Sequence, residues 1–148
     1  MKKSKLFLGA SILSLGLVLS FNPVTTYAAD ISPTSDESEQ NAIGGWSEET
    51  GYYINSEAYS KVMESRKSTP KHSGTDESRR PGGELHRRAH GWTTWVGEYH
   101  YTRARMESWG TVLTDSGRQW GYDGTEAISP WWVFNGDTAG SARTYYGN

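Results

Sequence analysis

Two arginines in the C-terminal half of the chain, Arg103 and Arg105, are separated by one residue. They lie in a segment where small or apolar side chains alternate with mainly charged ones. On a β-strand both side chains would lie on the same face. Two guanidinium groups on one face can hold a phosphate or pyrophosphate through paired N–H donors. The competing interpretation is a solvated face on which these arginines oppose Glu98 or Glu107.

Trp131 and Trp132 are adjacent, and consecutive residues of a strand point to opposite faces. At most one of the two rings can therefore belong to the core, and the other could stack on a sugar ring. Because a small domain without cysteine needs large side chains in its core, we expect most of the seven tryptophans to be buried.

Tyr99 and His100 form an aromatic–histidine pair shortly before the two arginines. With Asp115 or Asp123 and a serine, His100 could belong to a hydrolytic set. The sequence has no Gly-x-Ser-x-Gly elbow that would present a nucleophile. We therefore predict a structural or surface role for His100 and no catalytic residues.

His86 and His90 have the i, i+4 spacing of a helical zinc site. However, Arg87 occupies the position of the glutamate that activates water in a His-Glu-x-x-His motif, and glycines on both sides disfavour a helix. We interpret this segment as a solvated basic loop. The sequence therefore predicts neither a metal site nor a cofactor.

The first 28 residues have the pattern of a secretory signal peptide. Three lysines within the first five residues precede an apolar run over 6–21, Pro23 interrupts the helix, and small residues then favour cleavage near Ala28. The apolar run is short for a spanning helix. We predict a secreted, extracellular protein without stable membrane insertion.

Charge and cysteine content limit the class of partner. Removal of the leader takes away three of the 15 basic residues and no acidic one, which leaves 12 basic against 17 acidic residues and a net charge of −5. This balance disfavours a nucleic-acid-binding face. Without cysteine, stability must come from packing rather than from disulfides. A homodimer remains an open alternative.

Composition divides the chain into five segments. These are a signal peptide (1–28), a disordered spacer (29–43), a short aromatic and helical segment (44–64), a flexible linker rich in Ser, Pro, Gly and charge (65–89), and a β-rich domain (90–148). From His90 onward the period is two, with a hairpin predicted at 115–117 and a turn at 122–124. The fold class is mainly β, as a small antiparallel β-sandwich or partly open barrel.

The last 50 residues or so resemble the lactococcin 972 family of exported bacteriocins. The matching pieces are Gly110-Thr111-Val112, Gly117-Arg118-Gln119, Trp132-Val133 and Ala142-Arg143-Thr144-Tyr145-Tyr146. Tyr99-His100 is similar to an aromatic–histidine pair of the family, and Gly44-Gly45-Trp46 is similar to its opening. The resemblance implies an exported β-sandwich that acts on the envelope of related Gram-positive cells by binding the cell-wall precursor lipid II.

These observations predict a secreted, non-enzymatic, bacteriocin-like protein that binds a cell-envelope precursor or glycan. The binding residues expected are Arg103, Arg105, Trp131, Trp132, Tyr99 and His100. One alternative is a secreted module that binds wall polysaccharide or another glycan without killing. A second alternative is a small secreted hydrolase.

Overall fold

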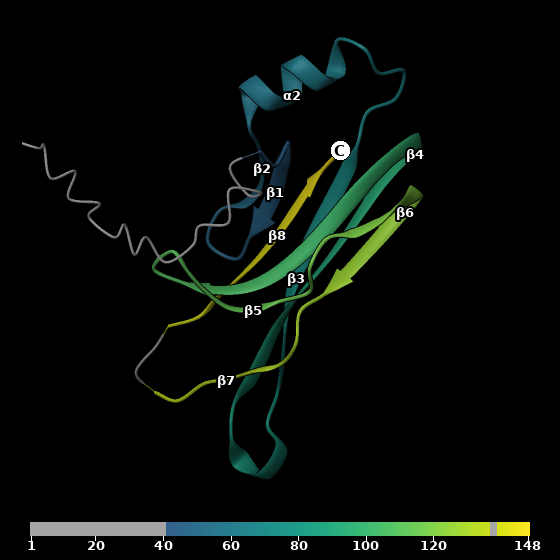
Figure 1. The fold of residues 1–148 in the computed structure, drawn as a ribbon. Helices are drawn as coiled ribbons and strands as arrows, with labels where there is room; N and C mark the ends of the chain where they lie inside the picture. Colours follow the sequence, from purple (N-terminus) through teal and green to yellow (C-terminus); the bar gives the residue numbers. More distant parts are fainter. Residues whose placement is uncertain (1–40, 137–138) are drawn as a thin grey trace, which may run out of the picture. The chain divides into compact units, whose positions relative to one another are not determined.

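The computed structural model describes residues 41–136 and 139–148, which form one antiparallel sheet, open and strongly curled into a half-barrel (Figure 1). The predicted signal peptide and nearly all of the spacer lie outside the described residues. The elements in chain order are β1 (Gly44–Ser47), β2 (Gly51–Ile54), α2 (Ser56–Met63), β3 (Lys71–Arg79), a 3-10 turn (Pro81–Gly83), β4 (His86–Ser108), β5 (Thr111–Asp115), β6 (Gln119–Ile128), β7 (Trp132–Val133) and β8 (Ser141–Gly147). The predicted fold class, mainly β with a partly open antiparallel barrel, is confirmed.

The 23-residue strand β4 is the centre of the sheet. Its first half pairs with β3 on one edge and with β6 on the other. Its second half pairs with β8 on one edge and with β6 and β5 on the other. β8 then pairs with β1, and β1 pairs with β2. β4 therefore carries side chains that belong to both ends of the sheet.

β4 and β6 bend at the same level, which curls the sheet. Gly97 of β4 has a φ of +76° and Asp123 of β6 has a φ of +63°. The Gly97 N–H donates to Oδ1 of Asp123 at 2.8 Å, so the two bends are tied together. As a result the two halves of β4 face each other, with Oγ1 of Thr93 and Oγ1 of Thr102 2.6 Å apart.

The core consists of two small apolar clusters rather than one large one. The first is built mainly from small residues, namely Ala89, Ala104, Met106, Ala127 and Ala142, with Trp46, Leu113 and Trp132 packed against it. The second contains Ile43, Trp95 and Tyr146, covered by Tyr59, Val62 and Met63 from α2. Trp95 is fully buried and donates its indole N–H to the Ser68 carbonyl at 2.8 Å.

A chain of polar side chains crosses the interior. His72 of β3 contacts Thr93 Oγ1 through Nδ1 and Thr144 Oγ1 through Nε2, both at 2.8 Å. Thr93 continues to Thr102 and then to Thr125, each step 2.6 Å between hydroxyl oxygens. Burial lowers the pKa of His72 to about 3, because desolvation disfavours the imidazolium. His72 is therefore a neutral, hydrogen-bonded part of the core.

The predicted flexible linker over 65–89 is corrected by the structure. Residues 71–79 form β3, which pairs with β4 from Lys71↔Thr94 to Arg79↔His86. The composition is polar because one face of this edge strand is exposed, and charged edges discourage pairing with other chains. The opposite face has little room for side chains, since a Cβ on Gly74 would lie 2.7 Å from the Trp46 ring.

The hairpin predicted at 115–117 is also corrected. β5 and β6 both run antiparallel to β4 along one edge, so the chain continues in one direction past Ser116, whose N–H donates to the Ala104 carbonyl at 2.9 Å. The reversal instead lies at Trp109-Gly110, between the paired residues Ser108 and Thr111. The turn predicted at 122–124 is the bend within β6 rather than a reversal.

The short helix predicted in 44–64 is confirmed as α2. Asn55 caps it by accepting the Ala58 N–H on its side-chain oxygen at 3.3 Å. Tyr59, Val62 and Met63 pack on the second cluster, as their spacing on one helical face predicts. Among the described residues no helix is both long and apolar enough to cross a membrane.

Candidate binding surface

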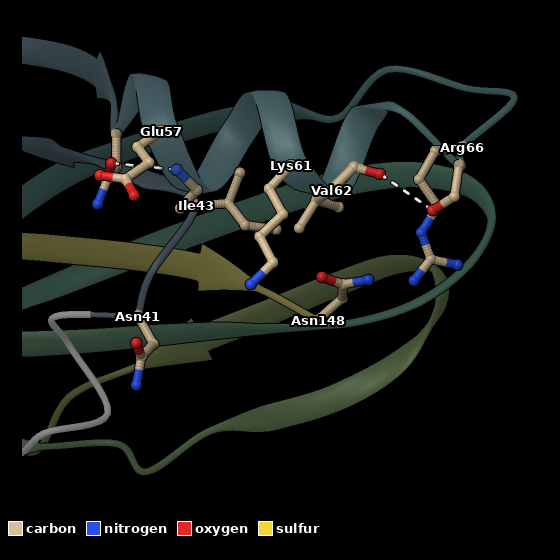
Figure 2. Close-up of a pocket in the computed structure, with 10 residues that line it drawn as sticks. Asn41, Ile43, Glu57, Lys61, Val62, Arg66 and Asn148 are labelled. Carbon is tan, nitrogen blue, oxygen red and sulfur yellow. Dashed lines mark hydrogen bonds between the residues drawn. The ribbon is translucent and has the colours of Figure 1, made fainter.

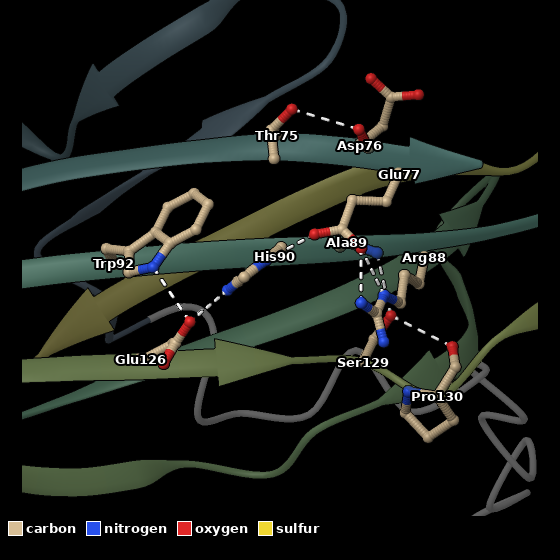
Figure 3. A network of polar contacts seen from close by, with 10 residues as sticks. All are labelled: Thr75, Asp76, Glu77, Arg88, Ala89, His90, Trp92, Glu126, Ser129 and Pro130. Carbon is tan, nitrogen blue, oxygen red and sulfur yellow. Dashed lines mark hydrogen bonds and ion pairs between the residues drawn. The ribbon is translucent and has the colours of Figure 1, made fainter. Parts of the chain in front are cut away.

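One face of the first half of β4 carries a continuous set of charged and aromatic side chains, shown in part in Figure 3. Arg88, His90 and Trp92 occupy every second position, opposite to the buried face of Ala89, Gly91, Thr93 and Trp95. Register places Glu77 of β3 beside Arg88 and Glu126 of β6 beside Trp92. We call the group formed by Glu77, Arg79, Arg88, His90, Trp92, Glu126 and Trp131 the Trp131 surface.

His90 lies between two carboxylates contributed by the strands on either side. Its Nδ1 is 2.6 Å from Glu77 Oε1, and its Nε2 is 2.6 Å from Glu126 Oε1 (Figure 3). The hydrogen bond from His90, with a further one from Arg88, outweighs desolvation and lowers the pKa of Glu77. The three strands are thus linked through the contacts of one imidazole with two carboxylates.

Trp92 and Glu126 form the exposed side of this bridge. The Trp92 ring lies 3.9 Å from the His90 ring between centroids, and its indole N–H donates to Glu126 Oε1 at 3.1 Å. The Glu126 side chain is 54% exposed. Within the described residues both of its contacts use Oε1. The other carboxylate oxygen is therefore available to accept a hydrogen bond from a ligand hydroxyl or amide.

At the other end of the surface, two guanidinium groups lie against the Trp131 ring. The Arg79 and Arg88 carbons Cζ lie 4.2 and 4.3 Å from its ring centroid, within the range of cation–π attraction. Arg88 is also held by Glu77, at 2.6 Å from Nη2 and 2.7 Å from Nε. Arg79 is exposed and has no carboxylate partner within the described part of the chain. It therefore keeps donors that can bind an anion.

Ser129 fixes the segment that presents Trp131. Its N–H donates to the Ala89 carbonyl at 2.9 Å, and its hydroxyl accepts the Ala89 N–H at 3.0 Å (Figure 3). Both Ala89 backbone groups are thus paired with one buried serine. Trp132, the next residue after Trp131, packs against the first core cluster. The two adjacent rings therefore point in opposite directions, as predicted: Trp132 toward the core and Trp131 toward the guanidinium groups.

Arg103 and Arg105 do share one face of β4, as their spacing predicts, but both are nearly fully buried. Arg103 pairs with Asp115 through two hydrogen bonds, one of them 2.8 Å from Nε to Oδ1. Arg105 Nη2 lies 3.2 Å from Asp115 Oδ2. Burial alone raises the pKa of Asp115, and the hydrogen bonds from Arg103, Gly117 and Arg105 outweigh it, so the pKa lies below its usual value. The partner is therefore Asp115 rather than the glutamates weighed from the sequence, although Glu107 lies 3.9 Å from Arg105.

The side chains of Tyr99 and His100 point to opposite faces of β4. Tyr99 is half-exposed and stacks on Trp120, with ring centroids 5.4 Å apart and 15° between planes. His100 is fully buried, and its Nδ1 lies 2.9 Å from the Glu98 carbonyl oxygen. His100 thus has the structural position that we predicted as an alternative to catalysis.

Most tryptophans are less buried than we expected from the sequence. Only Trp95 is fully buried, whereas Trp92, Trp109 and Trp120 are 37%, 95% and 44% exposed. The reason is that alanine, threonine and glycine occupy the inner face of the curled sheet, where the two layers approach closely. Aromatic rings therefore lie on the outside more often than composition suggests.

A separate pocket lies between α2 and the C-terminal end of β8 (Figure 2). Its volume is about 550 Å³, and its lining includes Lys61, Val62, Asn41 and Asn148. Arg66, at its edge, is held by Glu98 at 2.6 Å. The polar lining is mixed in charge, and none of the residues predicted as binding residues contributes to it.

Sequence reasoning missed the five ionisable members of the Trp131 surface: Glu77, Arg79, Arg88, His90 and Glu126. A signal was present, since Arg88, His90 and Trp92 alternate with small residues. We predicted residues 86–90 as a solvated basic loop, whereas they begin strand β4 and His90 is buried. On β4 His86 and His90 are about 13 Å apart, at about 3.3 Å per residue, and no metal-binding cluster occurs among the described residues.

Comparison with known proteins gave no match of any kind. No family model, no curated protein and no solved structure is significantly similar to this chain.

Proposed function

We propose that this chain is a secreted, non-enzymatic antibacterial protein of bacteriocin type that binds the lipid II precursor at the envelope of related Gram-positive bacteria. The observation that carries the proposal is the Trp131 surface, where an arginine without a carboxylate partner in the described chain lies on an indole ring. Lipid II offers a pyrophosphate to such an arginine and sugars to neighbouring indoles and carboxylates.

Each part of the ligand has a matching part of the surface. Arg79 and Arg88 would grip the pyrophosphate, with Trp131 holding both guanidinium groups in place. The exposed Glu126 and the edge of Trp92 would meet sugar hydroxyls and the apolar face of a ring. Since the mature chain carries a net charge of −5, recognition would depend on this local arrangement rather than on bulk attraction to anionic lipid.

Binding fits this surface better than glycoside cleavage does. A pair of carboxylates that cleaves a glycosidic bond needs space between them for water or for the sugar. The His90 ring fills the space between Glu77 and Glu126 and contacts both. The carboxylates are therefore held in a fixed structure by the imidazole.

Arg103 and Arg105 remain predicted ligand residues under this proposal, at lower rank. A pyrophosphate would have to displace Asp115 from two buried guanidinium groups. Removing Asp115 from two nearly buried cations costs more than adding a ligand to the exposed Arg79. We therefore assign the first contact to Arg79 and Arg88.

The test compares Arg79→Ala/Arg88→Ala with the parent protein and with Lys71→Ala, an exposed cation of the same strand. We expect the double variant to bind lipid II in nanodiscs at least tenfold more weakly and to lose inhibition of sensitive lawns, because the pyrophosphate donors are gone. Lys71→Ala should bind and inhibit as the parent does. Equal binding by the double variant would contradict the assigned site.

A glycan-binding module is the second candidate, supported by the exposed aromatic strip of Tyr99, Trp120 and Tyr122 on β4 and β6. These rings pack against each other in stacked and tilted pairs, so they would present edges as well as faces to a chain of sugars. A glycan module would bind the soluble disaccharide as tightly as whole lipid II and would not kill. Preference for the pyrophosphate-bearing ligand separates the two candidates.

A further inference from the structure

The tip of the β4–β5 hairpin presents a single tryptophan to solvent. Ser108 pairs with Thr111, so Trp109 and Gly110 are the two residues of the turn. Trp109 has a φ of +48° and Gly110 a φ of +81°. The Trp109 side chain is 95% exposed, the highest value among the exposed large hydrophobic residues of the described chain.

Tryptophan is a poor choice for this position. Two-residue hairpin turns with positive φ at both central residues favour Asn-Gly, because bulky side chains clash with the backbone in the left-handed region. The strain is not repaid within the described structure, since the ring is almost wholly in solvent. A strained, exposed large side chain is evidence that its energetic benefit comes from outside the fold.

We propose that Trp109 is a bilayer anchor that places its indole in the headgroup region of a lipid membrane. The inference goes beyond the proposed function, because it adds a contact to lipid that needs no lipid II. The surroundings favour lipid over a protein partner: Ser108, Gly110 and Thr111 are small or polar. A protein hot spot would need neighbouring residues that exclude water from the ring. An isolated indole, apolar with one N–H, is instead typical of membrane interfaces.

Charges beside the tip indicate the class of lipid. Arg143 lies 3.3 Å from Glu49 and 3.8 Å from Glu107, and these three residues share a cavity of about 240 Å³ with Trp109. Two carboxylates and one guanidinium would not be drawn to a strongly anionic surface. The geometry therefore points to a peripheral contact with neutral, zwitterionic headgroups, made by one ring without stable insertion.

The experiment measures flotation of the purified mature chain with phosphatidylcholine vesicles that contain no lipid II. The main variant is Trp109→Asn, since asparagine suits the left-handed turn and the fold should be kept. We expect vesicle-bound protein to fall at least tenfold in Trp109→Asn. In the control Val96→Asn, which removes an exposed apolar side chain at the bend of β4, flotation should equal that of the parent.

A second measurement gives the depth of the ring. With lipids brominated near the headgroup, fluorescence quenching in the parent should exceed that in Trp109→Phe, and the difference should shrink with bromine near the chain ends. Equal flotation of Trp109→Asn and parent, absence of parent flotation, or unchanged quenching in Trp109→Phe would each overturn the inference. The outcome does not depend on the Trp131 surface, because Arg79→Ala/Arg88→Ala should float like the parent.

Discussion

Each half of β4 contributes to a cluster of two arginines near carboxylates and aromatic rings, and the two clusters differ mainly in exposure. In the second half, Arg103 and Arg105 are 8% and 2% exposed and share Asp115. At the first half, Arg88 of β4 contacts both Glu77 and Trp131, and Arg79 of the neighbouring strand β3 stays exposed. Similar residue types therefore form a structural cluster where they are buried and a candidate ligand surface where they are partly exposed.

The largest expected difference between the two clusters concerns removal of the acidic partner. Asp115→Ala leaves two nearly buried guanidinium groups without their carboxylate, so we expect a loss of about 3–5 kcal/mol in the free energy of unfolding. Glu77→Ala, in the partly exposed cluster, should cost about 1 kcal/mol or less. Urea denaturation followed by far-UV circular dichroism measures both. Equal costs would mean that burial does not separate the two clusters.

The adjacent residues Trp131 and Trp132 show the same difference between a partly exposed and a core-packed position. Trp132 packs on the core and its ring lies so close to Gly140 that a Cβ there would be 2.7 Å away. Trp132→Ala should therefore cost about 3 kcal/mol, through lost packing and an unfilled cavity. Trp131→Ala should cost about 1 kcal/mol, the size of a partly exposed cation–π contact. Thermal or urea unfolding of the two variants checks the order, and a reversed order would contradict the assigned faces.

Burial also determines the expected pH dependence of stability. The pKa of His72 is about 3 in the folded protein and about 6.5 when unfolded. Between these values the unfolded chain binds the extra proton, so stability falls as the pH is lowered below about 6.5. The fall should reach up to about 2 kcal/mol between pH 7 and pH 5.

Between pH 5 and pH 7 the change in stability reports on His72 rather than on the carboxylates. Glu49, Glu77 and Asp115 have lowered pKa values, so their stabilising effect is present above their unfolded values near 4 and is lost only in more acidic solution. The variant His72→Asn should be less stable than the parent at pH 7. Its free energy of unfolding should, however, change little between pH 7 and pH 5. If the slope persists in His72→Asn, another group causes it.

The sequence allowed prediction of the fold class, the short helix and the opposed faces of Trp131 and Trp132, because each depends on local period or spacing. The bend at Asp123 was predicted only as a turn at 122–124, and its link to Gly97 was not predictable because the two residues are 26 positions apart in the sequence. β3 was missed because an edge strand with one solvated face has the composition of a linker. The Trp131 surface required the pairing of three strands, which depends on β3 and on the path of β6 past 115–117.

The smallest expected effect is a gain, and it extends the comparison to the tip of β4. Trp109 is 95% exposed, whereas Trp131 is only partly exposed, and Trp109 has no partner ring or guanidinium among the described contacts. Its left-handed backbone costs about 1–2 kcal/mol for a non-glycine residue, whereas asparagine tolerates this conformation through local hydrogen bonding. Replacing Trp109 by Asn should therefore raise the free energy of unfolding by about 1 kcal/mol while reducing flotation with vesicles.

Stability and lipid binding should thus move in opposite directions at this one position. Urea denaturation of Trp109→Asn and Trp109→Phe measures the first quantity, because phenylalanine keeps the strain and should leave stability near that of the parent. At the Trp131 surface, by contrast, Trp131→Ala lowers stability as it removes binding, since that ring contacts Arg79 and Arg88 within the fold. A loss of stability in Trp109→Asn would mean that the indole is held by the protein itself, and the strain would then need no external partner to explain it.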